Sequence, residues 1–563
     1  MDKIWLKSYP AGIPWEIDPT RYSSLVQLFE EAVARYATRP AYTNFGHTLT
    51  FADLDQLSNA FAAWLQTEAK LVRGDRVALM MPNILQYPVA LFGALRAGLC
   101  VVNTNPLYTA RELHYQLRDS GAKAIIAFDS AGKVICDALA GTAVERVILT
   151  GIGDLLGFLK GAIINFVRRY VQRQVPPHTL QQFDKFSAVL ALGHTLPFRA
   201  VDVAPDELAF LQYTGGTTGV SKAAMLTQRN MVANTLQADA WLSMFTARRQ
   251  EQQVIVGALP LYHIFALTSI ALLWLHQGGH AILITNPRDM RGFVKTLMKH
   301  HCTVYYGVNT LFNGLLNTPG FEKVNFTNLH SCVAGGMALQ SVVAEKWKAL
   351  TGCTLSQGWG LTETSPVATT MPFGIDFNHS IGLPVPSTSI SIRDEQGQEL
   401  PVGAEGEICV KGPQVMKGYW RQPEETATVM LADGWLRTGD LGRMDPQGFV
   451  YLDDRKKDMI VVSGFKVFPN EVEGVLARHP GVLEVAAVAE PDVHSGEAVA
   501  VFVVKKDPKL TSEALIAYAH ESLTSYKVPK HIYFRATLPK TNVGKILRRA
   551  LRDELAQTER ATH

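Results

Sequence analysis

The chain has 563 residues, 47% of them hydrophobic and 19% charged, and its formal net charge is +3. This length exceeds what one hydrophobic core serves, so we expect at least two domains. The small net charge argues against a nucleic-acid-binding protein, which normally carries a strongly basic surface. The six cysteines form no CxxC pair and the first ten residues lack the apolar core of a signal peptide. We therefore expect a cytoplasmic protein with reduced thiols.

The first part of the chain alternates predicted helices with predicted strands. The helices show apolar residues at helical spacing, and the strands are short apolar runs bounded by turn residues. This alternation predicts an α/β domain with a largely parallel sheet. The expected helices cover residues 24–33, 54–65, 87–97 and 110–119, and the expected strands lie within 74–82, 100–103 and 124–128.

The segment Leu155–Arg173 predicts an amphipathic helix. Its apolar residues fall on one helical face, and its positive charge comes from Lys160, Arg168, Arg169 and Arg173. Such a helix can lie on an anionic membrane surface, but most amphipathic helices pack their apolar face against their own domain. We expect the second arrangement and keep a peripheral contact with the cytoplasmic face of the membrane as the alternative.

A loop rich in glycine and hydroxyl groups lies between the apolar run Leu208–Leu211 and a predicted helix start at Thr227. We expect it to join a strand to a helix. Glycines let backbone N–H groups approach an anion, and hydroxyl groups can surround phosphate oxygens. A plain linker is the alternative, and the Walker spacing is absent. The predicted phosphate-binding residues are Tyr213, Thr214, Gly215, Gly216, Thr217, Thr218, Gly219 and Lys222.

Two further predicted strands end in glycine-rich segments. Open α/β sheets bind ligands at the carboxyl ends of their strands. Glycine backbone beside the flat ring of Trp359 suits a nucleoside base. The candidate residues are Gly335, Gly336, Gln357, Gly358, Trp359 and Gly360.

Two side chains near these strand ends can take part in chemistry. His263 follows the predicted strand that begins at Val254, although a lone histidine in apolar surroundings is more often structural. Glu363, beside Thr362, offers a hard oxygen ligand for Mg²⁺, although a Thr-Glu pair alone is common.

From about residue 388 to residue 456, short strands separated by Gly, Pro and Asp predict a β-rich subdomain. Asp440 ends the sequence Thr-Gly-Asp, which predicts a tight turn. An acidic residue placed there can bind ribose hydroxyls, although turn aspartates usually only form the turn.

The charge cluster Asp453–Asp458 predicts the main domain boundary, which divides the chain into residues 1–456 and 457–563. The second part has the size and pattern of a compact α+β domain. Near its end, Lys545 stands on a glycine-containing loop before a predicted helix. The alternative is a surface lysine at a helix start, where the dipole disfavours a cation.

Taken in order, these motifs resemble the adenylate-forming superfamily of acyl-CoA synthetases, luciferases and peptide-synthetase adenylation domains. The resemblance covers almost the whole chain, and the segments 433–440 and 454–465 are similar to the fatty acyl-CoA synthetase signature. Segments similar to bacterial long-chain fatty-acid–CoA ligases are 87–93, 283–289 and 410–416. Trp359 stands where this superfamily usually has tyrosine.

The resemblance implies a large N-terminal adenylate-forming domain, with parallel α/β sheets and a small β subdomain, and a small mobile α+β C-terminal domain. It implies that a long-chain fatty acid reacts with ATP to give acyl-AMP and pyrophosphate, and that coenzyme A then takes the acyl group. Mg²⁺ is the implied cofactor. The alternatives are an enzyme with another acyl group or acceptor and a non-catalytic binding protein. The oligomeric state is left open, with a homodimer as one possibility.

The resemblance also assigns roles to residues. The loop 213–219 would hold the β- and γ-phosphates, with Lys222 nearby, and Glu363 and Thr217 would bind Mg²⁺. Gly335, Gly336 and 357–360 would enclose adenine, while Asp440 and Arg455 would hold the ribose. Lys545 would bridge the carboxylate and the α-phosphate, with Lys457 and Asp458 at the hinge. Gly464 would lie on the coenzyme A path, and His263 between the acyl and coenzyme A approaches.

Overall fold

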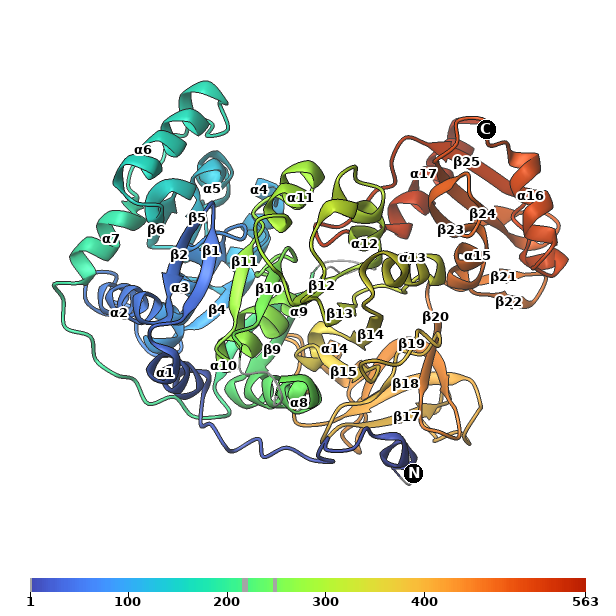
Figure 1. Cartoon of the computed structure of the whole chain (residues 1–563), viewed down its shortest axis with the longest axis horizontal. Coiled ribbons are helices and arrows are strands. Elements are labelled where there is room, and N and C mark those ends of the chain that lie inside the picture. The colour runs from blue at the N-terminus through green and yellow to red at the C-terminus, as the bar shows by residue number, and fades with distance from the viewer. Residues whose placement is uncertain (1–2, 215–220, 247–250, 563) are drawn as a thin grey trace.

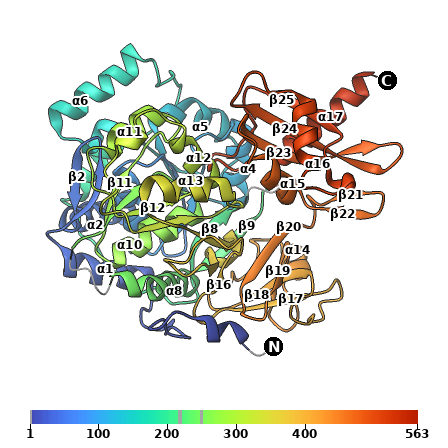
Figure 2. The ribbon, with the colours of Figure 1, turned by 45° about the vertical axis from the view of Figure 1, so that its right-hand side comes forward.

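The computed structural model describes residues 3–214, 221–246 and 251–562. Figure 1 shows a large body with two sheets, a smaller sheet beside it in orange and a C-terminal unit in red. In the turned view of Figure 2 the red unit also stands apart from the early, blue strands. The chain is a mixed α/β protein with a large N-terminal and a small C-terminal domain, as the sequence predicts.

The first large sheet has the strand order β7-β6-β5-β3-β4-β8-β9 and is parallel except for the pair β8–β9. Its central strands are buried on both faces, which is typical of a parallel sheet covered by helices. The strands are β3 (Arg76–Met80), β4 (Cys100–Asn103), β5 (Ala124–Phe128), β6 (Arg146–Thr150), β7 (Asp184–Lys185), β8 (Leu208–Tyr213) and β9 (Ala223–Thr227).

The second large sheet has the order β16-β15-β14-β13-β12-β10-β11-β1-β2, with a parallel centre and antiparallel pairs at both ends. Its strands are β1 (Pro40–Asn44), β2 (His47–Thr50), β10 (Val254–Gly257), β11 (His280–Leu283), β12 (Val304–Gly307), β13 (Ser331–Ala334), β14 (Leu355–Gly360), β15 (Val367–Thr370) and β16 (Leu383–Pro384).

Helices fill the space between the two large sheets and cover their outer faces. Phe29 and Phe92, from two of the inner helices, stack with ring centroids 4.4 Å apart. Successive residues of a strand point to opposite faces, so Tyr305 packs on Trp347 while the Tyr306 hydroxyl accepts a hydrogen bond from Trp274 at 3.1 Å. The helices are α1 (Leu25–Tyr36), α2 (Phe51–Thr67), α3 (Gln86–Arg96), α4 (Ala110–Ser120), α5 (Gly132–Ala138), α7 (Phe186–Gly193), α8 (Gln228–Thr246), α9 (Ile264–Ala266), α10 (Leu273–His276), α11 (Met290–Leu297), α12 (Asn309–Leu316) and α13 (Ser341–Thr351).

The predicted helices and strands of the first 130 residues are confirmed, but the sequence patterns missed the β1–β2 hairpin. The expected strand–loop–helix order around residue 220 is wrong. The strand β9 pairs antiparallel with β8 before α8 begins, so the glycine-rich loop joins a hairpin. Thr227 does cap α8, because its hydroxyl accepts from the Asn230 N–H at 3.2 Å.

The β-rich subdomain is a four-stranded antiparallel sheet formed by β17 (Ser389–Arg393), β18 (Gly406–Lys411), β19 (Leu436–Met444) and β20 (Val450–Arg455), flanked by α14 (Pro423–Val429). The tight turn expected at Asp440 is wrong, because this residue lies inside β19. Gly439 has a φ of +72°, and the ladder between β19 and β20 shifts register between Leu441 and Gly442. The turn-like composition therefore marks a bulged strand.

The C-terminal unit begins after β20, beyond residues 456–459. Its sheet has apolar cores on both faces, one under α15 and α16 and the other under α17. Its elements are β21 (Ile460–Val462), β22 (Phe465–Val467), α15 (Pro469–Leu476), β23 (Val482–Asp492), β24 (Gly496–Lys505), α16 (Ser512–His520), β25 (His531–Arg535) and α17 (Arg548–Thr562).

The segment 155–173 forms α6 (Phe158–Phe166) and a π-helical turn, but the expectation that its apolar face packs inward is wrong. Gly161, Asn165 and Arg168 attach it instead. A Cβ atom at Gly161 would lie 2.1 Å from the Gly153 carbonyl oxygen, and Arg168 forms two hydrogen bonds with Asp129. Small and polar residues therefore make much of the inner face, together with the partly buried Leu155 and Ile164.

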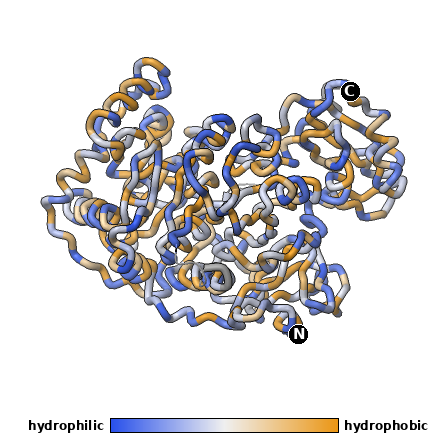
Figure 3. Tube along the Cα trace, viewed as in Figure 1, coloured by the Kyte–Doolittle hydropathy of each residue, from blue (hydrophilic) through white to orange (hydrophobic). Residues whose placement is uncertain are grey.

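Most of the bulky apolar residues of this segment consequently face outward. In Figure 3 α6 stands at the upper left edge of the molecule, with orange along much of its trace. No helix within the described ranges is long and apolar enough to cross a membrane. The exposed residues are Phe158, Leu159, Ile163, Phe166, Tyr170 and Val171, which are 58–90% exposed and are called the apolar patch below.

Candidate active site

A cavity of about 1910 Å³ lies where the second large sheet, the four-stranded sheet and the C-terminal unit meet. This volume exceeds the usual size of a single small-ligand pocket. Most of the predicted site residues line it: Tyr213, Thr214, Lys222, His263, Gly335, Gly336, Gln357, Gly358, Trp359, Gly360, Thr362, Glu363, Asp440, Arg455 and Lys545. Gly464, in the β21–β22 turn, does not line it. Gly215, Gly216, Thr217, Thr218 and Gly219 lie outside the described residues.

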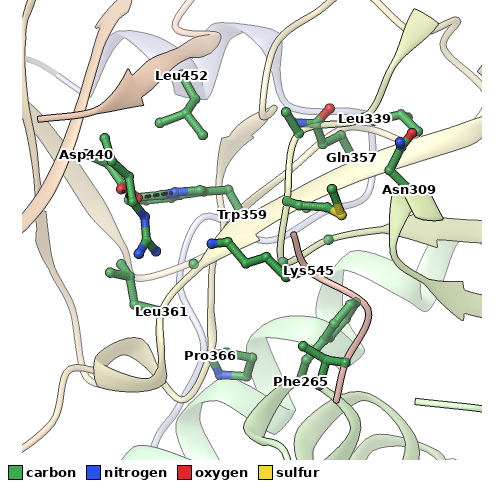
Figure 4. Close-up of a pocket in the computed structure, with 18 of the residues that line it drawn as sticks. Phe265, Asn309, Leu339, Gln357, Trp359, Leu361, Pro366, Asp440, Leu452 and Lys545 are labelled. Atoms are coloured by element: carbon green, nitrogen blue, oxygen red, sulfur yellow. Dashed lines mark hydrogen bonds and ion pairs between the residues drawn. The ribbon is translucent and has the colours of Figure 1, made fainter. Parts of the chain in front are cut away.

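One wall of the cavity carries an aromatic ring fixed by a carboxylate. The Trp359 indole N–H donates to Asp440 Oδ2 at 2.9 Å, and Arg455 Nε lies 3.3 Å from Asp440 Oδ1. Asp440 and Arg455 face each other across the β19–β20 ladder. Figure 4 shows the indole and the carboxylate joined at the edge of the pocket. Tyrosine has no indole N–H, so this contact depends on the tryptophan.

Beside this ring, the wall is backbone. A Cβ atom at Gly335 would lie 3.3 Å from the Gly358 carbonyl oxygen and 3.0 Å from the Phe265 ring, so the two strand ends approach closely. Gly336 has a φ of +74°. The buried Oε1 atom of Gln357 has no hydrogen-bond partner among the described residues. An unsatisfied buried acceptor marks a place for a donor group.

A second wall carries alternating charges. The Tyr419 hydroxyl donates to Glu363 Oε1 at 2.6 Å, and the Lys222 amine lies 5.3 Å from the centre of the Tyr419 ring. Lys222 also pairs with Glu425. Sequence patterns gave no signal for Tyr419 or Glu425, because both come from a segment with no distinctive spacing.

The base of the glycine-rich loop is closed by backbone contacts. The Thr214 N–H donates to the Lys222 carbonyl oxygen at 2.8 Å. The Tyr213 hydroxyl donates to Asp119 Oδ2, in α4, at 2.5 Å. This hydrogen bond ties the end of β8 to α4. Tyr213 therefore fixes the end of β8, and Thr214 and Lys222 hold the two ends of the loop together.

Lys545 extends from the C-terminal unit into the cavity, with its amine turned toward Trp359 in Figure 4. Burial and the charge of Arg455 lower the pKa of Lys545 to about 7. Its own loop is held by Thr541, whose hydroxyl accepts from the Lys545 N–H at 3.1 Å. From the other domain, the Thr310 hydroxyl donates to the Gly544 carbonyl oxygen at 2.8 Å. The alternative of a surface lysine is therefore wrong.

His263 has both a structural contact and a place on the cavity wall. Its Nδ1 accepts from the Phe265 N–H at 3.3 Å and caps α9. The ring proton therefore lies on Nε2. Burial and the charge of Lys545 lower the pKa of His263 to about 4. The side chain is neutral at pH 7, so it can donate or accept a hydrogen bond but supplies no positive charge.

The residues of the site fit Mg²⁺ only if the ion is bound jointly by protein and substrate oxygens. Within the described residues, no cluster of three or more His, Cys, Asp or Glu side chains could hold a metal ion by itself. Mg²⁺ usually takes one or two protein carboxylates together with substrate phosphates. Glu363, on the cavity wall beside Lys222, has the chemistry for that arrangement.

Comparisons with known proteins agree with this geometry. Residues 29–420 match the AMP-binding enzyme family model, and residues 471–545 match the AMP-binding enzyme C-terminal domain. A long-chain-fatty-acid–CoA ligase of Escherichia coli O6:H1 is 54% identical over 555 residues, or 98% of each chain.

Solved structures share the fold over nearly the whole chain. The ATP-bound MatB structure from Rhodopseudomonas palustris has a TM-score of 0.79 and 28% identity, and covers 94% of this chain and 98% of that one. The anthranilate CoA ligase AuaEII in complex with anthranoyl-AMP has a TM-score of 0.83, and covers 97% of this chain and 100% of that one. At 22% identity, this second likeness concerns the fold alone.

Proposed function

Because the chain belongs to the AMP-binding enzyme family, we propose that it activates a long-chain fatty acid with ATP and transfers the acyl group to coenzyme A. In the first step a carboxylate oxygen bonds to the α-phosphorus, and pyrophosphate leaves. In the second, the coenzyme A thiolate attacks the acyl carbon, and AMP leaves. The name of the 54% identical relative supports this substrate class.

The observation that carries the proposal is Lys545 in the cavity. A carboxylate and a triphosphate repel each other, so alignment and charge neutralisation dominate such a reaction. The Lys545 ammonium faces the Trp359–Asp440 wall, and no carboxylate among the described residues forms a salt bridge with it. It would neutralise the charge of the carboxylate and the α-phosphate as they react.

The nucleotide would lie along the fixed aromatic ring. Trp359 would contact the adenine face, and the unsatisfied Gln357 Oε1 would accept from the adenine amino group. The Trp359 indole N–H and the ion pair with Arg455 would hold the Asp440 carboxylate in position for the ribose hydroxyls. Lys222 and the adjoining loop would hold the leaving pyrophosphate.

Glu363 would hold Mg²⁺ together with the phosphates of ATP, and the metal would neutralise part of their charge. The Tyr419 hydroxyl fixes one oxygen of this carboxylate at 2.6 Å. The other oxygen remains for the ion. Thr217, the second ligand predicted from the sequence, stays a prediction.

The acyl chain would occupy the apolar part of the cavity. Trp241 and Leu242 of α8, together with Phe265 and Leu273, line this part. They come from the buried run 264–275 and from the helix beside it. The volume of the cavity allows a nucleotide and an apolar chain to be bound together.

A panel of acids tests the proposal. We expect pyrophosphate release that depends on oleate, with octanoate weaker and benzoate weakest, and thioester formation when coenzyme A is added. Release that is independent of any acid would contradict the enzymatic proposal, and a preference for benzoate would contradict the fatty-acid substrate.

The apolar patch on α6 supports a peripheral contact with an anionic lipid surface. Its side chains are bulky and exposed, and exposed basic residues lie beside them, namely Lys160, Arg169 and Arg173. A helix with apolar residues inserted among lipid chains and basic residues at the headgroups is a common form of interfacial binding. Figures 1 and 2 show α6 at the periphery, away from the C-terminal unit.

Sedimentation with vesicles of phosphatidylglycerol and phosphatidylcholine tests this contact. Phe158→Ser with Phe166→Ser removes apolar contact from two exposed positions, so we expect folding to be kept and vesicle binding to fall by about tenfold or more. The matched control is Val493→Ser, which changes a 98% exposed side chain outside the patch. Unchanged vesicle binding, or a loss of dimers on a sizing column instead, would contradict the lipid contact.

A further inference from the structure

A cluster of buried charges lies beside Lys545 and joins the two domains. At its centre is Arg548, the first residue of α17. Its Nε and Nη2 bind the two oxygens of Glu473 at 3.0 and 2.8 Å, and its Nη2 also donates to Asn470 Oδ1 at 2.7 Å. These partners belong to α15 in the same small domain. This part of the cluster therefore fixes Arg548 within its own domain.

The remaining donor of Arg548 reaches the other side of the domain connection. Its Nη1 lies 3.2 Å from Asp454 Oδ1 in β20, and Asp454 is 1% exposed. The other oxygen of Asp454 accepts from the Asn470 N–H, in the first turn of α15, at 2.9 Å. A carboxylate at a helix N-terminus is favoured by the helix dipole. Asp454 therefore holds both α15 and α17.

Residues 456–459, which connect the two domains and are called the connecting segment below, are held by the same cluster. Arg552 Nη1 donates to Asp458 Oδ1 at 2.8 Å, and Arg548 Nη1 lies 3.8 Å from Asp458 Oδ2. Burial opposes the charged form of Asp458, but the hydrogen bond from Arg552 and the charge of Arg548 keep its pKa below its usual range. Rotation of the small domain about residues 456–459 would separate Asp454 from Arg548.

We propose that the Asp454–Arg548 pair is a latch that holds the small domain in the orientation that places Lys545 in the cavity. Lys545 is three residues before Arg548, so the anchor and the reacting group share one short segment. On the other side of Lys545, the Gly544 carbonyl oxygen accepts a hydrogen bond from the Thr310 hydroxyl of the large domain. Asp454 and Arg548 are positioning residues, and both lie outside the segments that match the family models.

The latch rests on the proposed function and predicts an unequal effect on the two steps. If only the latched orientation forms acyl-AMP, the rate of that step is proportional to the latched fraction. Couplings of this kind usually change an equilibrium by 5- to 150-fold. Weakening the pair should therefore slow acyl-AMP formation by about tenfold, without slowing the transfer from acyl-AMP to coenzyme A.

Asp454→Asn is the sharpest variant, because it removes the charge from the large domain and leaves Arg548 paired with Glu473. The two half-reactions are measured separately in the whole chain: pyrophosphate formation from ATP and oleate in a single turnover, and thioester formation from supplied oleoyl-AMP and coenzyme A. The matched control is Asp553→Asn, the same change at an exposed carboxylate that pairs with Arg549 inside α17. Thermal unfolding checks that each variant is folded.

We expect Asp454→Asn to lower the first rate about tenfold and to leave the second rate unchanged or raised, while Asp553→Asn changes neither. Equal losses in both steps, or no loss in the first, would overturn the latch. Failure of the proposed function is distinguishable, because the wild-type chain would then form no acid-dependent pyrophosphate at all.

Discussion

Lys545 and Arg548 are two cations three residues apart, and their surroundings are opposite. Arg548 is bound by carboxylates from β20, α15 and the connecting segment. The amine of Lys545 lies in the cavity near the guanidinium of Arg455, and its pKa falls to about 7. An uncompensated buried cation is costly unless an anion binds to it. The comparison indicates that Arg548 holds the small domain in place, whereas Lys545 is kept for a ligand.

The largest expected effect comes from removing the Lys545 amine, which tests its assignment to a ligand. Lys545→Ala should slow acyl-AMP formation by about 10²- to 10³-fold, because it removes a preorganised charge from the reacting centre. Thioester formation from supplied acyl-AMP should largely survive. Single-turnover measurement of each half-reaction checks this, and an equal loss in both would refute the assigned role.

The next effect concerns stability and should have opposite results at the two positions. Arg548→Ala leaves Glu473 and Asp454 without their cation, which should lower the free energy of unfolding by about 3 kcal/mol. Lys545→Met removes a charge that forms no salt bridge with a carboxylate among the described residues and whose burial lowers its pKa, so the free energy of unfolding should stay the same or rise. Denaturant titration of both variants is the check. Equal destabilisation by the two variants would contradict the different roles assigned to Arg548 and Lys545.

The titration of Lys545 gives a third test. Its pKa in the folded chain is about 7 and its ordinary value is 10.5, so the charge needed for catalysis is present below pH 7 and is lost above it. The first-step kcat/KM should fall by about tenfold per pH unit above pH 7. In Lys545→Arg this decline should be absent, because arginine stays protonated. A decline that persists in the arginine variant would assign it to another group.

The same titration has a consequence for stability. Between pH 7 and 10.5 the unfolded chain holds a proton on Lys545 that the folded chain has lost. The free energy of unfolding therefore rises with pH through this window, and Lys545→Met should remove that rise.

A smaller effect is expected at the aromatic wall. Trp359→Phe keeps a flat ring but removes the indole N–H that donates to Asp440. The loss of one such hydrogen bond is about 1 kcal/mol, so the KM for ATP should rise by about fivefold at similar kcat. An unchanged KM would show that the contact does not hold Asp440 for the ribose.

The sequence predicted the α/β class, the first helices and strands and most of the residues around the cavity, because glycines at strand ends and the Lys545 loop are local patterns. It did not predict the partners of those residues. Tyr419 beside Glu363, Thr310 beside Gly544 and Asp454 beside Arg548 come from distant segments. Contacts of that kind follow from the packing of the domains, and no rule of residue spacing predicts them.

The segment 155–173 shows a second limit. Helical periodicity identified an apolar face, but periodicity says nothing about the direction in which the face points. The glycine contact at Gly161 and the ion pair of Arg168 turn the polar and small face inward. At Asp440, the Thr-Gly-Asp composition predicted a turn, whereas pairing with β20 makes it part of a strand.

The most direct test of acyl activation follows the oxygen atoms. A fatty acid labelled with ¹⁸O in its carboxylate is incubated with the wild-type chain, ATP, Mg²⁺ and coenzyme A, and the AMP is analysed by mass spectrometry. If the carboxylate attacks the α-phosphorus, the AMP that leaves in the second step carries one ¹⁸O atom. AMP without the label would contradict an acyl-AMP intermediate and, with it, the role proposed for Lys545.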